Sequence, residues 1–123
     1  MKKILLAIAL LSASLYANLA QADWEWYAAD AQGGHYYYDK STAVNRYDRG
    51  LVKSLWTKTT HEDGTYDITR QEINCTNRQW RPVQITSYMP NARVYATEGP
   101  VEMEWRWIPP DSIILGLSKK LCR

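Results

Sequence analysis

The sequence predicts an α+β fold that is mostly β: a six-stranded antiparallel sheet in meander order, with a C-terminal helix packed on one face and tied by a disulfide. Short runs of tryptophan, tyrosine, valine and threonine alternate with turn residues. One amphipathic segment closes the chain, and two cysteines follow an export-type N-terminus. We therefore expect residues 1–22 to be a signal peptide and residues 23–123 to form a single domain.

The first 22 residues have the three parts of a secretory signal peptide. Lys2 and Lys3 form the positive start, an apolar stretch follows over residues 4–15, and Ala20-Gln21-Ala22 supplies small residues for cleavage. A membrane anchor needs about 20 apolar residues, and polar residues interrupt this stretch. We expect cleavage after Ala22 and export to the periplasm or the cell surface, with no lipoprotein cysteine and no stable membrane insertion.

Loss of the signal peptide would make the domain electrically neutral. Lys2 and Lys3 leave with it, so 13 of the 15 lysines and arginines remain, against 13 acidic residues. Nucleic-acid binding depends on basic groups that neutralise phosphates, and attraction to anionic membranes has the same requirement. We therefore expect no nucleic-acid partner and no electrostatic binding to membranes.

Six runs of β-forming residues predict the strands. Turn residues such as Gly33-Gly34, Asp48-Arg49-Gly50 and Asp63-Gly64 separate them. In the fourth run, alternation places Ile73 and Cys75 on one face, but both faces mix polar and apolar residues. A bulge or a change of core face along this run both remain open, and a cover over one side of the sheet is indicated. The runs are 23–28, 35–39, 51–60, 65–75, 79–88 and 93–97.

The C-terminal segment predicts an amphipathic helix over residues 113–122. Pro109-Pro110-Asp111-Ser112 supplies residues typical of a helix start. Ile114, Leu117 and Leu121 recur at helical spacing. So short a helix is marginal alone, so it must pack on the sheet. Three cations suit the C-terminal end of the helix dipole: Lys119, Lys120 and Arg123.

Cys75 and Cys122 predict one disulfide. An even number of cysteines in an exported chain usually forms bridges rather than metal sites or nucleophiles. Closing a loop of about 48 residues is worth roughly 4 kcal/mol in the chain-entropy model, which is comparable to the net stability of a small domain. Two buried free thiols and an intermolecular bridge are the alternatives.

No group of residues in the sequence has the pattern of a catalytic or metal-binding motif. His35 and His61 are the two histidines, and neither has the i, i+4 partner of a helical zinc motif. No Gly-x-Ser-x-Gly elbow surrounds a serine, and bridged cysteines are not nucleophiles. No haem-attachment motif occurs. We expect a protein that is not an enzyme, without catalytic residues, metal or cofactor.

Aromatic residues are the remaining signal, with six tryptophans, nine tyrosines and no phenylalanine. Tryptophan and tyrosine join apolar area to a polar group, which suits binding surfaces. Two interpretations are open, because period-two rings either form the core of the sheet or stand exposed to a partner. The candidate binding surface comprises Trp24, Trp26, Tyr37, Trp105 and Trp107.

Several short motifs follow one another along the chain in a recognisable order. They are Asp23-Trp24, Tyr37-Tyr38-Asp39, Trp56, Glu72-Ile73-Asn74-Cys75, Arg78 to Arg81, Ser87-Tyr88, and Trp107-Ile108-Pro109-Pro110-Asp111-Ser112 with Cys122. In this order the chain resembles the surface-adhesin protein E-like domains of Gram-negative bacteria, over nearly all of residues 23–123. The resemblance implies a six-stranded antiparallel sheet with the C-terminal helix held on its concave side by the disulfide.

The resemblance also implies a function in adhesion. We expect an exported, non-enzymatic binding domain that acts on a protein partner, with a host extracellular-matrix protein as one candidate. The alternative is a soluble periplasmic accessory protein that binds an envelope protein or a small ligand. The sequence leaves the partner and the oligomeric state open.

Overall fold

The computed structural model describes residues 22–100 and 103–123. Residues 1–21, which hold nearly all of the predicted signal peptide, lie outside the described residues. The described elements are β1 (Glu25–Ala29), β2 (His35–Tyr38), the 3-10 helix η1 (Lys40–Thr42), β3 (Val44–Tyr47), β4 (Leu51–Thr60), β5 (Tyr66–Asn74), β6 (Gln79–Tyr88), β7 (Val94–Glu98), β8 (Arg106–Trp107) and α2 (Ile113–Leu121).

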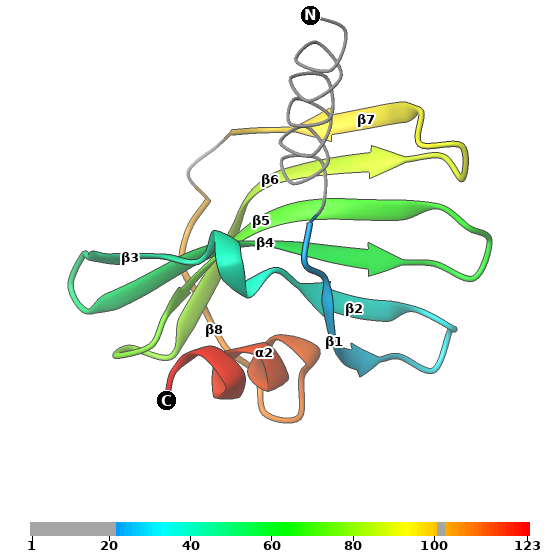
Figure 1. Cartoon of the computed structure of the whole chain (residues 1–123). Helices are drawn as coiled ribbons and strands as arrows, with labels where there is room; N and C mark the ends of the chain where they lie inside the picture. Colours follow the sequence, from blue (N-terminus) through cyan, green and yellow to red (C-terminus); the bar gives the residue numbers. More distant parts are fainter. Residues whose placement is uncertain (1–21, 101–102) are drawn as a thin grey trace, which may run out of the picture.

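The strands form one antiparallel sheet with the order β1-β2-β4-β5-β6-β7 (Figure 1). This order confirms the predicted six-stranded meander, and each predicted strand agrees with the structure to within two residues at either end. Two short strands were not predicted. β3 pairs with the first half of β4, whose second half pairs with β2, and β8 pairs with the start of β6, whose end pairs with β7.

The cross-strand register defines two faces of the sheet, because residues paired across strands share a face. The helix face is the side on which Tyr38, Leu55 and Ile73 pack against α2. The outer face is the opposite side. One row across the outer face is Trp26, Tyr37, Lys58, Ile68 and Thr86.

A bulge between β5 and β6 resolves the question that alternation left open in the fourth run. The register shifts between Arg70 and Gln71, and Gln71 pairs with Pro82. Proline cannot donate to the ladder and is typical of bulges. The bulge lies on β6, so β5 keeps its alternation and directs Ile73 toward the helix.

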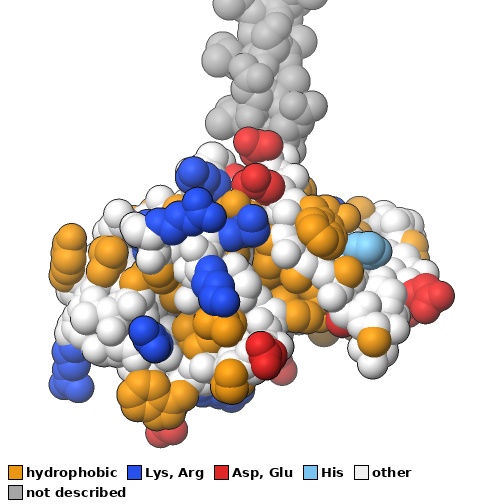
Figure 2. Space-filling view, turned by 90° about the horizontal axis from the view of Figure 1, so that it is seen from below, with side chains coloured by type: hydrophobic (Ala, Val, Ile, Leu, Met, Phe, Trp, Pro, Cys, Tyr) orange, Lys and Arg blue, Asp and Glu red, His pale blue; other side chains and the backbone are white. Residues whose placement is uncertain are grey.

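α2 covers the helix face, and the sheet curves around it (Figure 1). Ser112 caps its start, since the Ser112 hydroxyl accepts a hydrogen bond from the backbone N–H of Leu115 at 3.2 Å. Leu117 and Leu121 join the buried core. Figure 2 views this side of the molecule, where lysine and arginine side chains gather, and the last helical turn contributes the exposed Lys119 and Lys120.

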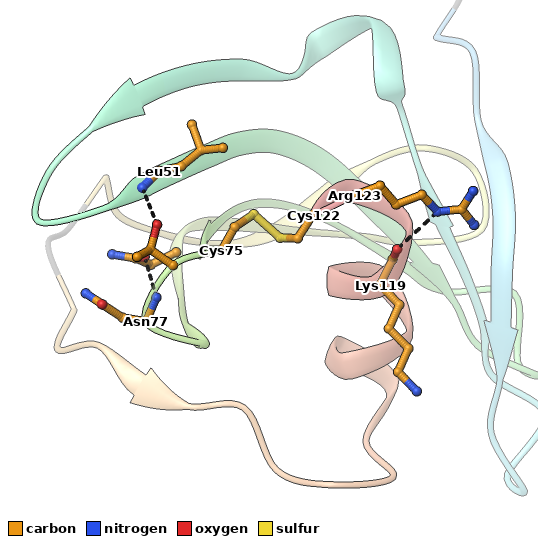
Figure 3. Close-up of a disulfide and its surroundings, with 8 residues drawn as sticks. Leu51, Cys75, Asn77, Lys119, Cys122 and Arg123 are labelled. Carbon is orange, nitrogen blue, oxygen red and sulfur yellow. Dashed lines mark hydrogen bonds between the residues drawn. A yellow bond between two sulfur atoms is a disulfide. The ribbon is translucent and has the colours of Figure 1, made fainter.

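The disulfide joins the end of β5 to the end of α2 (Figure 3). Cys75 and Cys122 are bridged with Cα atoms 5.4 Å apart, which confirms the predicted bridge within one chain. Cys75 is also fixed by the sheet, because its N–H donates to the carbonyl of Leu51 at 2.8 Å. Nearby, the Leu51 N–H donates to the Thr76 hydroxyl and the Asn77 side-chain amide donates to the Arg49 carbonyl. The helix is thus tied to a well-bonded corner of the sheet.

Candidate binding surfaces

Trp26 and Tyr37 come together on the outer face of the sheet. They are direct cross-strand partners on β1 and β2. Trp26 is 53% exposed, and its indole N–H donates to Nδ1 of His35 at 3.2 Å. Tyr37 is half-buried and pairs with Lys58 on its other side. Two of the five predicted residues therefore form one continuous aromatic surface.

This surface extends across β4, β5 and β6 through residues that the sequence analysis did not select. The Lys58 ammonium lies 4.8 Å from the centroid of the Tyr66 ring. Tyr66 stacks on Tyr88, with centroids 4.8 Å apart and planes 9° apart. The Arg70 guanidinium lies 5.7 Å from the Trp56 ring. We call the whole set the outer aromatic patch: Trp26, Tyr37, Trp56, Lys58, Tyr66, Arg70 and Tyr88.

Trp105 and Trp107 lie at the other edge of the sheet. β8, which carries Trp107, pairs with β6, whereas β1 forms the opposite edge beyond β2, β4 and β5. Trp107 is 72% exposed. Trp105 is half-buried under the Arg81 guanidinium, 4.3 Å from its ring centroid. Trp24 is half-buried and precedes β1. The five predicted residues therefore do not form one site.

A buried ion cluster holds the Trp105 end of the outer face in place. Glu72 is 7% exposed and accepts hydrogen bonds from Arg46 at 2.8 Å and from Arg81 at 2.8 Å. The hydrogen bond that Arg46 donates to Glu72 raises the pKa of the Arg46 guanidinium. Arg81 also donates to the carbonyl of Met103 at 3.1 Å. Glu72 and Met103 thus hold the Arg81 guanidinium in place, and the Trp105 ring packs against it.

The two histidines lie in separate places. His35 accepts the bond from Trp26 described above. His61, in the turn between β4 and β5, lies 2.8 Å from a carboxylate oxygen of Asp67, and Ser87 donates to the other oxygen of Asp67 at 2.6 Å. Within residues 22–100 and 103–123, no three His, Cys, Asp or Glu side chains are grouped so that they could hold a metal ion. Over the same residues, no helix is long and apolar enough to cross a membrane.

Comparison with known proteins gives one match. The family model described as Surface-adhesin protein E matches residues 24–123, which include every described strand, the helix and both cysteines. Curated proteins and solved structures gave no match. The match covers most of the 123-residue chain, so this chain belongs to the surface-adhesin protein E family.

Proposed function

We propose that this protein is an exported, non-enzymatic adhesin domain that binds a protein partner through the outer aromatic patch. Family membership supports an adhesin-like function in general, a non-enzymatic role and an exported or surface location. Within the proposal, residues 1–22 are the export signal, and a host extracellular-matrix protein is the first partner to test.

The observation that carries the proposal is the exposed aromatic row on the outer face. Trp26 is more than half exposed, and Tyr37 lies beside it in register. Tryptophan and tyrosine supply large contact areas at a small entropic cost and are enriched among the residues that dominate interface energies. The stacked Tyr66 and Tyr88 extend the same surface over two further strands.

Two cations within the patch suggest the chemistry of the partner. Lys58 and Arg70 lie against aromatic rings, which restricts their side chains before any partner arrives. Preorganised cations beside half-buried rings match a partner segment that presents carboxylates next to apolar side chains. Binding should therefore weaken as the salt concentration rises.

The surface is tested by substitution and direct binding. The mature protein is immobilised and titrated with purified extracellular-matrix glycoproteins, and Trp26→Ala should raise the Kd about tenfold or more, as expected for a central aromatic anchor. Tyr47→Ala is the matched control, since Tyr47 is 85% exposed on β3, outside the patch. An unchanged Kd for Trp26→Ala, with a loss for Trp107→Ala, would move the site to β8.

Location is tested separately. Protease added to intact cells should digest the protein if it lies outside the outer membrane, with a periplasmic enzyme as the protected control. The mass of the exported protein should correspond to a chain that begins at Asp23. Protection from protease would favour the alternative function, a periplasmic accessory protein that binds an envelope partner.

A further inference from the structure

A pocket of about 540 Å³ lies beside α2, at the corner where the disulfide joins the helix to the sheet (Figure 3). Three segments form its walls: the turn between β5 and β6, the chain that leads from β8 to α2, and one side of α2 itself. This side of α2 is distinct from the side that carries Leu117 and Leu121 into the core. Its residues are Leu115, Ser118, Lys119 and Cys122. The pocket therefore exists only when the helix is docked on the sheet.

The walls of this pocket are fixed relative to one another. The disulfide between Cys75 and Cys122 joins the turn to the helix. The backbone N–H of Ile108 donates to the carbonyl of Arg78 at 3.1 Å, which joins the chain after β8 to the same turn. The pocket is thus preformed, so that a ligand would not have to order its walls on binding.

The apolar part of the lining is aliphatic. It comprises Ile108, Pro110, Leu115 and the half-buried disulfide. Among the described residues, no aromatic side chain lines this pocket, so a ligand could not stack on a ring here. Contact with the walls would instead come from the burial of aliphatic surface, which is favourable in proportion to its area. The lining therefore suits an aliphatic chain better than a ring system.

The two charged residues of the lining are both cations. Arg78 lies in the turn and Lys119 on the helix, and both are exposed to solvent. No Asp or Glu of the described residues lines the pocket. Within residues 22–100 and 103–123, neither Arg78 nor Lys119 takes part in an ion pair. Cations on two walls of one pocket, without a carboxylate beside them, favour an anionic group at its rim.

We propose that this pocket binds a small amphipathic anion, an aliphatic chain that ends in one carboxylate. The chain lies against Ile108, Pro110 and Leu115, and the carboxylate lies at the exposed rim between Arg78 and Lys119. The volume of about 540 Å³ is within the range of small-molecule sites, about 300–1,000 Å³. Walls on three sides suit a dissolved molecule rather than a membrane surface. The pocket shares no residue with the outer aromatic patch, so the failure of either proposal leaves the other standing.

The experiment compares octanoate with octanamide, which has the same chain length but no charge. Each is titrated into isotope-labelled protein while nuclear magnetic resonance follows the backbone amides of Ile108 and Ser118. Octanoate should shift both signals saturably and bind about tenfold more tightly than octanamide, because only the carboxylate pairs with the two exposed cations. This preference should shrink as the salt concentration rises, since exposed charges are screened.

Charge-removing variants isolate the two cations. The double variant Arg78→Gln and Lys119→Gln should reduce the affinity for octanoate to that for octanamide and leave the affinity for octanamide unchanged. The matched control is Arg49→Gln with Lys120→Gln, which should keep the tenfold preference. Arg49 is an exposed turn arginine with φ of 54°, close to the 55° of Arg78, and Lys120 is exposed next to Lys119 but outside the pocket lining. Melting curves show whether each variant is folded.

A filling variant tests the location of binding. Ser118→Phe should occupy the pocket and abolish the shifts, whereas Lys120→Phe, on the same helix but outside the lining, should not. The proposal fails if octanoate gives no saturable shifts, if octanoate and octanamide bind equally to the unmodified protein, or if the shifts fall outside the pocket. Binding of the protein to vesicles of anionic phospholipid, without binding of octanoate, would assign the two cations to a membrane surface and would also overturn it.

Discussion

Glu72 is the centre of a buried ion cluster on the outer face of the sheet. Its carboxylate lies between Arg46 and Arg81 and is nearly inaccessible to solvent. Alternation along β5 places Glu72 on a face with Arg70 and Tyr66, which by itself indicates a solvated side. Its burial arises because β3 supplies Arg46 and β6 supplies Arg81, and no local pattern at residue 72 encodes either neighbour.

Glu72→Gln should lower the free energy of unfolding by about 3 kcal/mol, because two guanidinium groups lose a carboxylate that compensates them in a buried place. Urea denaturation measures the change. Glu62→Gln, in the exposed turn between β4 and β5, is the control and should change stability by less than about 0.5 kcal/mol. Equal effects of the two changes would show that the cluster adds no stability.

Ionisation of Tyr36 should lower the stability of the folded protein at alkaline pH. Burial and the hydrogen bond to Asp30 raise its pKa from 10.0 to about 12. Between these values the unfolded chain has released the Tyr36 proton while the folded protein keeps it, so stability is complete below pH 10 and declines as the pH rises toward 12. Tyr36→Phe removes this contribution, so its stability should fall less steeply over the same range in denaturation curves. Parallel pH profiles of the two proteins would contradict the assignment.

Among the elements, α2 was predicted to within one residue, whereas β3 and β8 were missed. The helix has local signals, with Ser112 at its start and apolar residues at helical spacing. β8 has only two residues, and the four residues of β3, Val44-Asn45-Arg46-Tyr47, carry no clear alternation. Both strands exist because they pair with β4 and β6, and pairing partners are not a local property.

The packing of α2 depends on Leu117, which is fully buried against the helix face. Leu117→Ala should lower the free energy of unfolding by about 3 kcal/mol through lost burial and the cavity that remains. It should also increase amide hydrogen exchange in α2 more than in β4 and β5, because the helix loses its main anchor. Leu115→Ala, at a half-buried position outside the core cluster, is the control. Uniform exchange in all elements would mean that helix and sheet open as one unit.

At the scale of the whole molecule, the disulfide joins two segments that lie 47 residues apart in sequence. The double variant Cys75→Ala and Cys122→Ala should lower the melting temperature by more than about 10 °C, given roughly 4 kcal/mol from loop closure. The unmodified protein in reductant is the control, and its melting temperature should equal that of the double variant. A melting curve unchanged in both would show that packing alone holds the helix.

The burial of the aromatic rings could not be predicted from the alternation within single strands. The sequence left open whether the tryptophans form the core or a surface, and the structure divides them. Trp80 packs against the core, Trp26 and Trp107 are exposed, and Trp24, Trp56 and Trp105 are half-buried. The largest aromatic residue of the buried core is Tyr38, which the sequence analysis did not distinguish from Tyr36 and Tyr37.

The sequence by itself determined the six main strands, the helix, the pair of bridged cysteines and the family, because turn residues, periodicity and motif order are written along the chain. Only the tertiary structure decided the register, which face of the sheet α2 covers, and the burial of Glu72. Period two separates the two sides of a strand, but it does not say which side another segment will cover. That choice depends on contacts between residues far apart in sequence, such as Arg46 with Glu72 and Cys75 with Cys122.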